Sequence, residues 1–154
     1  MTLLARLLGL LLPACGAPGA QGLPVPPPLD MAQLARPASP NTALAAPADF
    51  RLAPDVVTPA YHVPAARLYA AIQAVAAAQP RTYRTAEYPD RLQADWVARS
   101  AVLNFPDMIT AQATPAGADA ATLVLYSHSV YGYGDLGANR RRVEIWLAAL
   151  DRML

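Results

Sequence analysis

The sequence contains few of the residues that build disulfide frameworks, metal centres or nucleic-acid interfaces. Its one cysteine, Cys15, excludes a disulfide framework and a site with four thiolate ligands. Its two histidines are too few for a site built mainly from histidine ligands, and we expect neither a metal nor a cofactor. Lysine is absent, and the formal net charge of +1 lacks the basic excess of a general nucleic-acid binder. We therefore expect no nucleic-acid partner.

Proline divides the chain into two parts. The 154 residues allow one domain of ordinary size or a smaller domain with a long tail. Twelve of the sixteen prolines lie within residues 1–64, and residues 16–64 show no sustained helical or strand period. The run Pro26 to Pro28 favours extended polyproline-type backbone. We interpret residues 15–59 as a semi-rigid, mostly exposed tether and residues 60–154 as a single domain that folds without it.

The N-terminus is typical of an export signal. Arg6 supplies one positive charge, and small residues follow the apolar run from Leu7 to Leu12. That run is too short to cross a bilayer, which takes about 20 residues as a helix. A charged start, a short apolar core and small residues predict a secretory signal peptide over residues 1–14.

The end of this signal resembles the lipobox of bacterial lipoproteins. The residues are Leu12-Pro13-Ala14-Cys15, and in such proteins the cysteine becomes the lipidated first residue of the mature chain. Pro13 is atypical of that box. The residue after the cysteine is Gly16 and not an aspartate, and by the same resemblance this favours the outer membrane. A plain secretory signal and an uncleaved start are the alternatives.

The rest of the sequence predicts two helices with strands between them. Ala65 to Gln79 is rich in strong helix formers, carries the apolar stripe Leu68, Ile72 and Val75, and ends at Pro80. A C-terminal helix, with Asn139 as its N-cap, carries the stripe Val143, Trp146, Leu147, Leu150 and Leu154. Period-two alternation and turn signals predict four strands, at Arg81–Glu87, Leu92–Ala101, Met108–Thr114 and Ala121–Val130.

This order of elements predicts an α+β fold, preceded by the signal peptide and the Pro/Ala-rich tether. Short connections make consecutive strands antiparallel neighbours. Two helices on one face of a four-stranded antiparallel sheet form a two-layer sandwich that buries both apolar stripes. The predicted strand Leu92–Ala101 alternates as expected of burial on a single face. Its core-facing positions are Leu92, Ala94, Trp96 and Ala98, and the positions between them are Gln93, Asp95, Val97 and Arg99.

Two short motifs have ordinary structural explanations. Residues 132–137 match G-x-G-x-x-G, but a dinucleotide site needs a second parallel strand after the following helix, and the sequence predicts none. The segment Ser127-His128-Ser129 lies on a predicted strand, where adjacent side chains point to opposite faces. Neither serine therefore comes within the roughly 3 Å of His128 that a nucleophile–base pair needs, and only a distant partner remains open.

The run from Asn139 to Arg142 places three cations in the first turn of a helix, where they oppose its macrodipole. One interpretation is an anion site made of helix amides and guanidinium groups. The other is a structural clamp, in which the arginines pair with Asp107, Asp135 or Glu144. A rotation of about 100° per residue directs Arg142 towards the sheet and leaves Arg141 more exposed.

Three stretches resemble the bacterial and plastid domain-of-unknown-function family 1499. They are Leu103-Asn104-Phe105-Pro106-Asp107, Tyr126-Ser127-His128-Ser129 and the stretch from Gly132 to Arg142. The Phe-Pro-Asp step and the Asp-Leu-Gly-x-Asn-Arg-x-Arg run are the most specific, and the likeness covers residues 60–153. The family's pattern has an arginine where this chain has His128, which weakens any anion site that needs a fixed positive charge there. The resemblance implies no activity.

Two classes of function are consistent with these residues. The first is a lipid-anchored cell-envelope protein that faces the periplasm and has a binding or accessory role. Its partners are the membrane, through the N-terminal lipid, and an anionic small molecule, a lipid headgroup or an envelope protein. The candidate residues for anion binding or for the clamp are Asp107, His128, Asp135, Asn139, Arg140, Arg141 and Arg142.

The second class is a small envelope hydrolase that uses Asp107, His128 and Asp135 as acid–base groups. This hypothesis requires the three side chains to converge in one concave pocket. A structural protein without a ligand is a third, simpler option.

Overall fold

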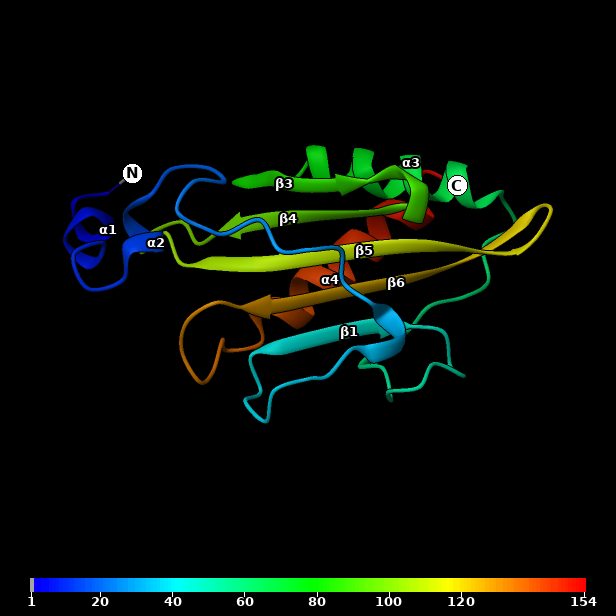
Figure 1. Ribbon diagram of the computed structural model, residues 1–154, viewed down its shortest axis with the longest axis horizontal. Helices are drawn as coiled ribbons and strands as arrows, with labels where there is room; N and C mark the ends of the chain where they lie inside the picture. The colour runs from blue at the N-terminus through cyan, green and yellow to red at the C-terminus, as the bar shows by residue number, and fades with distance from the viewer. Residues whose placement is uncertain (1) are drawn as a thin grey trace.

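The computed structural model describes residues 2–154 and shows a six-stranded sheet (Figure 1). The helices are α1 (Leu3–Leu8), α2 (Pro13–Gly16), α3 (Ala65–Ala77) and α4 (Ala138–Asp151), with 3-10 turns at Met31–Gln33 and Pro89–Arg91. The strands are β1 (Thr42–Ala46), β2 (Val56–Val57), β3 (Thr82–Tyr88), β4 (Gln93–Arg99), β5 (Pro106–Gly117) and β6 (Ala120–Ser129). The sheet order is β2-β1-β6-β5-β4-β3; β1 and β2 pair in parallel and the other neighbours are antiparallel.

The prediction of a four-stranded antiparallel sheet is wrong, because the sheet is mixed and has six strands. The four expected strands are present as β3 to β6, but β1 and β2 come from residues that we had assigned to the tether. Residues 42–46 of β1 are buried throughout. A strand buried on both faces shows no polar–apolar alternation, and three of its five residues are alanines between prolines, so no strand pattern marks it.

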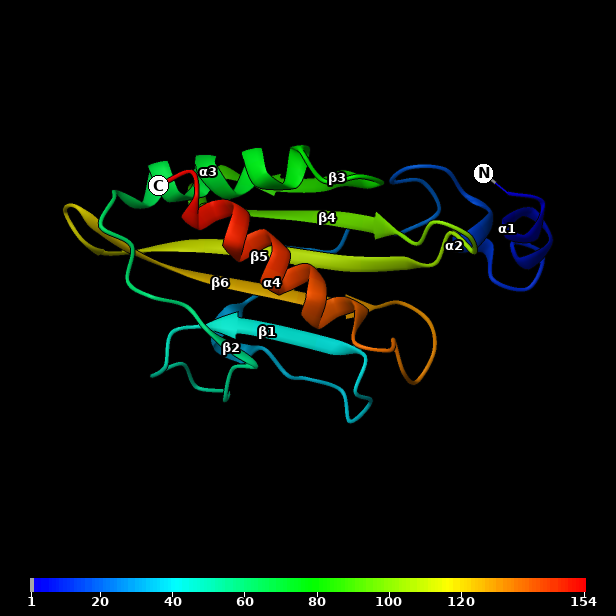
Figure 2. The same ribbon diagram turned by 180° about the vertical axis from the view of Figure 1, so that it is seen from behind.

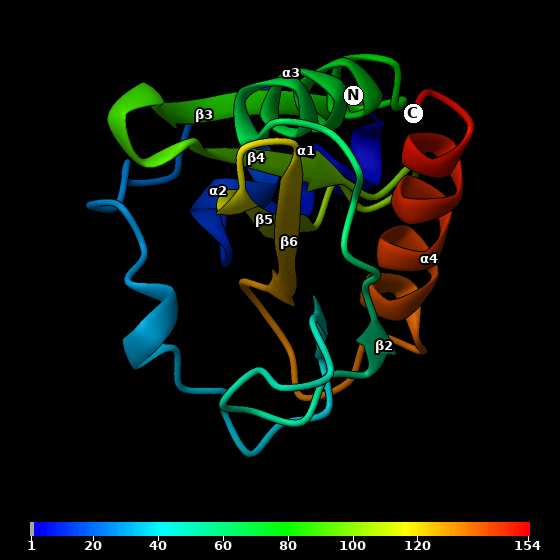
Figure 3. The same cartoon turned by 90° about the vertical axis from the view of Figure 1, so that its right-hand side faces the viewer.

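Two helices cover one face of the sheet, as predicted. Figures 2 and 3 show α3 and α4 side by side on this face. Leu68 and Ile72 of α3, together with Val143 and Trp146 of α4, are fully buried against it. Trp96 of β4 meets Trp146 edge to face, with ring centroids 5.6 Å apart, an arrangement that aromatic pairs favour.

The start of α4 differs from the prediction by two residues. Gly137, with a φ of 75°, is the N-cap, and Asn139 lies fully buried inside the first turn. Asp135 does the capping instead: its carboxylate accepts the backbone N–H groups of Gly137 at 2.9 Å and of Asn139 at 2.7 Å. The assignment of Asn139 as the N-cap was therefore wrong, because a preceding carboxylate satisfies these amides.

The other face of the sheet is covered by the N-terminal part of the chain. Residues 17–29, which we call the strap, run along this face in Figure 1. As a result β4 is buried on both faces, with Gln93, Asp95, Val97 and Arg99 at most 3% exposed. The prediction that this strand is buried on one face only was wrong. The strap that buries its second face is a proline-rich segment far away in sequence. The sequence of the strap has no helical or strand period from which this packing could be predicted.

The two N-terminal helices lie together at one end of the molecule (Figure 2). Thr2 Oγ1 caps α1 and donates to the carbonyl of Val102 in the β4–β5 loop at 2.6 Å. Within residues 2–154, no helix has the length and apolar character that crossing a membrane requires.

Candidate functional site

The buried amide of Asn139 organises a hydrogen-bonded cluster between α4 and the sheet. Its Oδ1 accepts from Ser127 Oγ at 2.6 Å and from Arg142 Nη1 at 2.8 Å. Its Nδ2 donates to Asp135 Oδ2 at 2.8 Å, to Ser129 Oγ at 3.0 Å and to the Asn41 carbonyl at 3.0 Å. Both ends of the amide are thus fully used, as buried polar groups require. The cluster joins α4 to β6 and to the residue preceding β1.

Arg142 adds an ion pair to this cluster. Its Nη2 lies 2.7 Å from Asp107 Oδ2, and the two side chains are 17% and 13% exposed. Its Nη1 also donates to Ser127 Oγ at 3.1 Å. The cluster therefore holds Asp107, Asp135, Asn139 and Arg142 of the predicted site. These side chains form a continuous row of bonds, from Asp135 to Asn139, to Arg142 and on to Asp107, which is the geometry of a structural clamp.

The two other arginines of the run point away from this cluster. Arg140 pairs with Glu144 at 3.0 Å across one exposed helical turn. Arg141 is exposed and donates to the carbonyl of Leu136 at 2.9 Å. The prediction that Arg142 faces the sheet while Arg141 is the more exposed of the two is confirmed.

His128 lies on the opposite face of the sheet from the clamp. Its ring stacks on Tyr126, with centroids 5.3 Å apart, while Ser127 and Ser129 point towards Asn139. Burial lowers the pKa of His128, and the hydrogen bond with the Ser129 carbonyl and the charge of Asp107 act in the opposite direction.

The three acid–base groups of the hydrolase hypothesis do not converge in one cavity. Asp107 and Asp135 line a cavity between the β4–β5 and β6–α4 loops. His128 lines a different cavity, beneath the strap. Among residues 2–154, no group of three or more histidine, cysteine or acidic side chains is placed to hold a metal ion.

A pocket rich in arginine lies beside the clamp, between α4 and the edge of the sheet where β3 begins and β4 ends. It has a volume of about 250 Å³, and its described lining contains four arginines but no Asp or Glu. Two of these already have strong partners: Arg142 pairs with Asp107, and Arg99 donates to carbonyls of the strap. The other two, Arg81 and Arg141, form no ion pair within residues 2–154. We call this the arginine pocket.

The sequence indicated Arg141 as a possible free cation but did not indicate Arg81. Arg81 directly follows Pro80, and its Nε donates to the carbonyl of Arg99 at 3.0 Å. Its backbone has a φ of 52°, a left-handed conformation that is uncommon outside glycine. Pairing of β3 with β4 brings Arg81 to the start of α4, a contact between residues about 60 positions apart that no local pattern reports.

Side chains of the folded domain hold the residues around Cys15. Arg99 is 3% exposed and donates to the carbonyls of Gly19 at 2.9 Å and Gln21 at 2.8 Å. Asn104 Nδ2 donates to the carbonyls of Cys15 at 2.8 Å and Ala17 at 2.9 Å. The start of the strap is therefore fixed on the domain by hydrogen bonds to its main chain.

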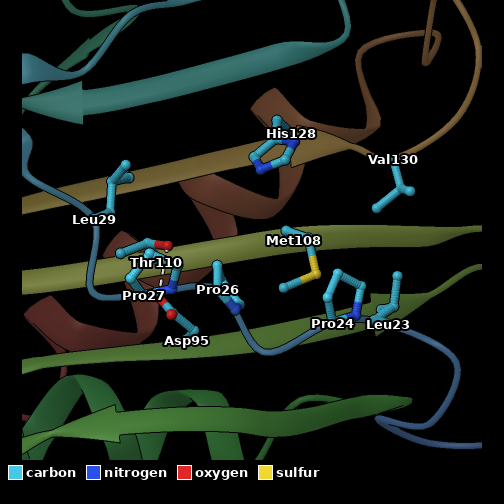
Figure 4. A pocket seen from close by; sticks show the side chains of 10 residues that line it. All are labelled: Leu23, Pro24, Pro26, Pro27, Leu29, Asp95, Met108, Thr110, His128 and Val130. Atoms are coloured by element: carbon cyan, nitrogen blue, oxygen red, sulfur yellow. Dashed lines mark hydrogen bonds between the residues drawn. The ribbon is translucent and has the colours of Figure 1, made fainter.

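The strap closes a cavity of about 270 Å³ against the sheet (Figure 4). Its lining is three prolines and two leucines of the strap on one side and Asp95, Met108, Thr110, His128 and Val130 on the other. Asp95 is 1% exposed and accepts a hydrogen bond from Thr110 Oγ1 at 2.7 Å. Burial raises the pKa of the Asp95 carboxyl, and the hydrogen bond from Thr110 offsets part of that rise. Asp95 occupies a polar position of the alternating strand, which predicts exposure to solvent, and nothing in the sequence marks it as a site residue.

These features define a domain with a mixed six-stranded sheet, two helices on one face and its own N-terminal strap on the other. The chain belongs to the family described as protein of unknown function (DUF1499), whose model matches residues 33–150. The match begins before β1, so β1 and β2 are part of the family's domain. No curated protein and no solved structure matches this chain.

Proposed function

We propose that this chain is a lipid-anchored protein of the cell envelope whose domain binds an anion of the phosphate or lipid-headgroup type. Cys15 is the lipidated first residue, and the domain faces the periplasm from the outer membrane. The observation that carries the proposal is the arginine pocket, in which Arg81 and Arg141 face a concave surface without any carboxylate. Guanidinium groups match phosphate oxygens with paired N–H donors.

The position of Cys15 supports the anchoring. Because Arg99 and Asn104 hold the main chain of residues 15–21, the domain lies directly next to its anchor and not at the end of a long tether. A lipid on Cys15 therefore brings this end of the molecule against the membrane. One acyl chain alone gives weak binding, so a second contact with the bilayer contributes to stable attachment.

Exposed apolar side chains at the same end provide such a contact. Val102 and Leu103 in the β4–β5 loop are 56% and 36% exposed, and Tyr133 and Leu136 in the β6–α4 loop are 75% and 94% exposed. The two loops lie together, because residues from both line one cavity with Leu12. Apolar and aromatic side chains of this kind insert at the headgroup level of a bilayer. Two residues that line the arginine pocket, Arg99 and Ala138, directly adjoin these loops in the chain, so an anionic headgroup bound there would lie near them.

The test measures binding of the full chain carrying Cys15→Ser, which cannot be lipidated, to vesicles. We expect sedimentation with phosphatidylglycerol vesicles and little with phosphatidylcholine vesicles. Each arginine near an anionic surface contributes about 1 kcal/mol, so Arg81→Gln with Arg141→Gln should weaken binding about 30-fold. The matched control replaces Arg67 and Arg152, two exposed arginines outside the pocket, by glutamine, and should bind like the parent chain.

Two further titrations distinguish binding of a free phosphate from binding of a lipid headgroup in a bilayer. Titration with inorganic phosphate and with glycerol 3-phosphate reports whether the pocket takes the free ion or requires the bilayer. Equal loss of binding in the pocket variant and in the control variant would contradict the proposal, because the attraction would then be a property of net charge. Retention of binding in the pocket variant would contradict it as well.

A further inference from the structure

We propose that the cavity beneath the strap is a second binding site, for a small, mainly apolar molecule that carries an ammonium group. This site is separate from the arginine pocket and does not depend on the anion proposal. Figure 4 shows Asp95 and Thr110 at one side of the cavity, with the strap prolines above them and Met108 and His128 beyond. The cavity holds about 270 Å³, room for a molecule of modest size.

The ligand's positive charge follows from the environment of Asp95. This carboxyl is 1% exposed, and its one described hydrogen bond comes from the neutral hydroxyl of Thr110. No arginine or histidine of residues 2–154 forms an ion pair with it. A buried carboxylate without a cation is unfavourable, whereas an ammonium group in the cavity would supply both the missing charge and hydrogen-bond donors.

The apolar body of the ligand follows from the remaining walls. Pro24, Pro26 and Pro27 of the strap and Met108 and Val130 of the sheet present only carbon and sulfur side-chain atoms. A ligand that buries this surface gains the hydrophobic contribution, and Asp95 then fixes its orientation. His128, whose pKa burial lowers, adds a neutral polar group at the far side.

The strap makes a rigid wall because its own main chain is held in place. Tyr88 Oη donates to the carbonyl of Pro26 at 2.5 Å, and Gln93 Nε2 donates to the carbonyl of Leu29 at 2.8 Å. Together with the bonds from Arg99, these donors hold the strap on either side of the cavity. Prolines lack an N–H group, so an extended proline-rich segment binds through its carbonyls. The cavity is therefore preformed.

The experiment uses the full chain carrying Cys15→Ser and three probes of equal length: octylamine, octanol and octanoate. Calorimetric titration near pH 7 should give an affinity for octylamine at least tenfold higher than for octanol, with octanoate the weakest. Asp95→Asn should remove this preference and leave octanol binding unchanged. The matched control, Asp119→Asn in the exposed β5–β6 turn, should bind all three probes like the parent chain.

A second variant tests whether the probes bind inside the cavity. Met108→Trp fills the space and should abolish binding of octylamine and octanol together, with a melting temperature recorded to show that the variant folds. Asp95→Asn removes an uncompensated buried charge, so its melting temperature should not fall. Equal affinities for octylamine and octanol in the parent chain would overturn the proposal. Unchanged octylamine binding in either cavity variant would also overturn it.

Discussion

Buried charged side chains in this protein fall into two groups according to their partners. Arg142 pairs with Asp107 and also donates a hydrogen bond to Asn139 Oδ1. Asp95 and Arg99, on the strap side of β4, have no partner of opposite charge among the described residues; one accepts from a hydroxyl and the other donates to carbonyls. The first group stabilises the fold by mutual neutralisation. Arg99 faces the strap and Asp95 faces the cavity beneath it. The free-energy cost of burying each charge therefore depends on the groups that it meets there.

The clamp makes a clear prediction for two adjacent arginines. Arg142→Ala leaves the buried Asp107 without its cation and removes two further hydrogen bonds, which should destabilise the fold by about 2–3 kcal/mol. For a chain of this size that corresponds to a melting temperature lower by roughly 5–10 °C. Arg141→Ala removes one exposed hydrogen bond and should change the melting temperature by less than about 2 °C. Scanning calorimetry of both variants at neutral pH provides the measurement, and equal shifts would show that the clamp is not structural.

Asp135 should make the stability of the fold depend on pH in the acidic range. Burial raises the pKa of its carboxyl, but the backbone and side-chain N–H groups of Asn139 and the N–H of Gly137 outweigh that effect, so its pKa lies below the ordinary value of 3.8. The ionised form therefore stabilises the fold above about pH 4, and this contribution is lost as the pH falls through the lowered pKa.

Comparing the parent chain with Asp135→Asn across pH 7 to 2 measures this contribution. The melting temperature of the variant should be lower at neutral pH, and the difference should shrink towards zero in acid. The exposed Asp119→Asn variant controls for the change in net charge. A difference between parent and Asp135→Asn that stays constant with pH would contradict the assignment.

At the scale of elements, β1 connects the proline-rich part of the chain to the core. Its residues Ala43, Leu44 and Ala45 have no exposed surface, and it pairs antiparallel with β6 from Thr42↔His128 to Ala45↔Leu125. Without β1 the edge of β6 would present free N–H and C=O groups. β1 is thus part of the sheet's structure although its sequence resembles the linker on either side of it.

Two fragments test how much β1 contributes. Residues 31–154 keep β1 and β2, whereas residues 60–154 lose both but keep the four strands and two helices that the sequence predicted. Burying Leu44 and the flanking alanines contributes about 3–5 kcal/mol, so the longer fragment should melt at least about 10 °C higher. Heat unfolding followed by circular dichroism compares them. Equal melting temperatures would show that residues 60–154 are independent of β1.

At the scale of the whole molecule, one end combines the features that a membrane contact needs. The helix α2, which contains Cys15, and the loops that follow β4 and β6 lie towards the same end of the molecule (Figures 1 and 2). The arginine pocket is lined by Thr82 at the start of β3 and Arg99 at the end of β4. The β5–β6 turn and the C-terminus lie towards the opposite end. Under the proposed function, a lipid on Cys15 would hold this end of the domain against the membrane.

Replacing the cysteine tests the anchor separately from the pocket. If Cys15 carries the proposed lipid, Cys15→Ser should move the protein in cells from the membrane fraction to the soluble fraction, because serine has no thiol to take a lipid. Metabolic labelling with a radioactive fatty acid should mark the parent chain and not the variant. Cys15→Ala serves as the second variant, and a protein that stays in the membrane fraction after both changes is held there by something other than this lipid.

Local sequence patterns determined the elements whose sequence has a period. The apolar stripes of α3 and α4 marked both helices, alternation marked β3 to β6, and a rotation of 100° per residue oriented Arg142 and Arg141 correctly. These patterns located the helices and strands because the spacing of side chains along a helix or strand is a property of the local backbone.

Only the tertiary structure decided what covers the second face of the sheet and which polar residues meet there. Asp95 and Arg99 alternate with apolar residues as a solvent-facing row does, yet the strap buries both. The main chain that Arg99 contacts lies 78–85 residues away in sequence. It belongs to a proline-rich segment whose sequence has no period. Its binding depends on main-chain carbonyls, which every sequence provides. No residue pattern can therefore report such a contact before the chain has folded.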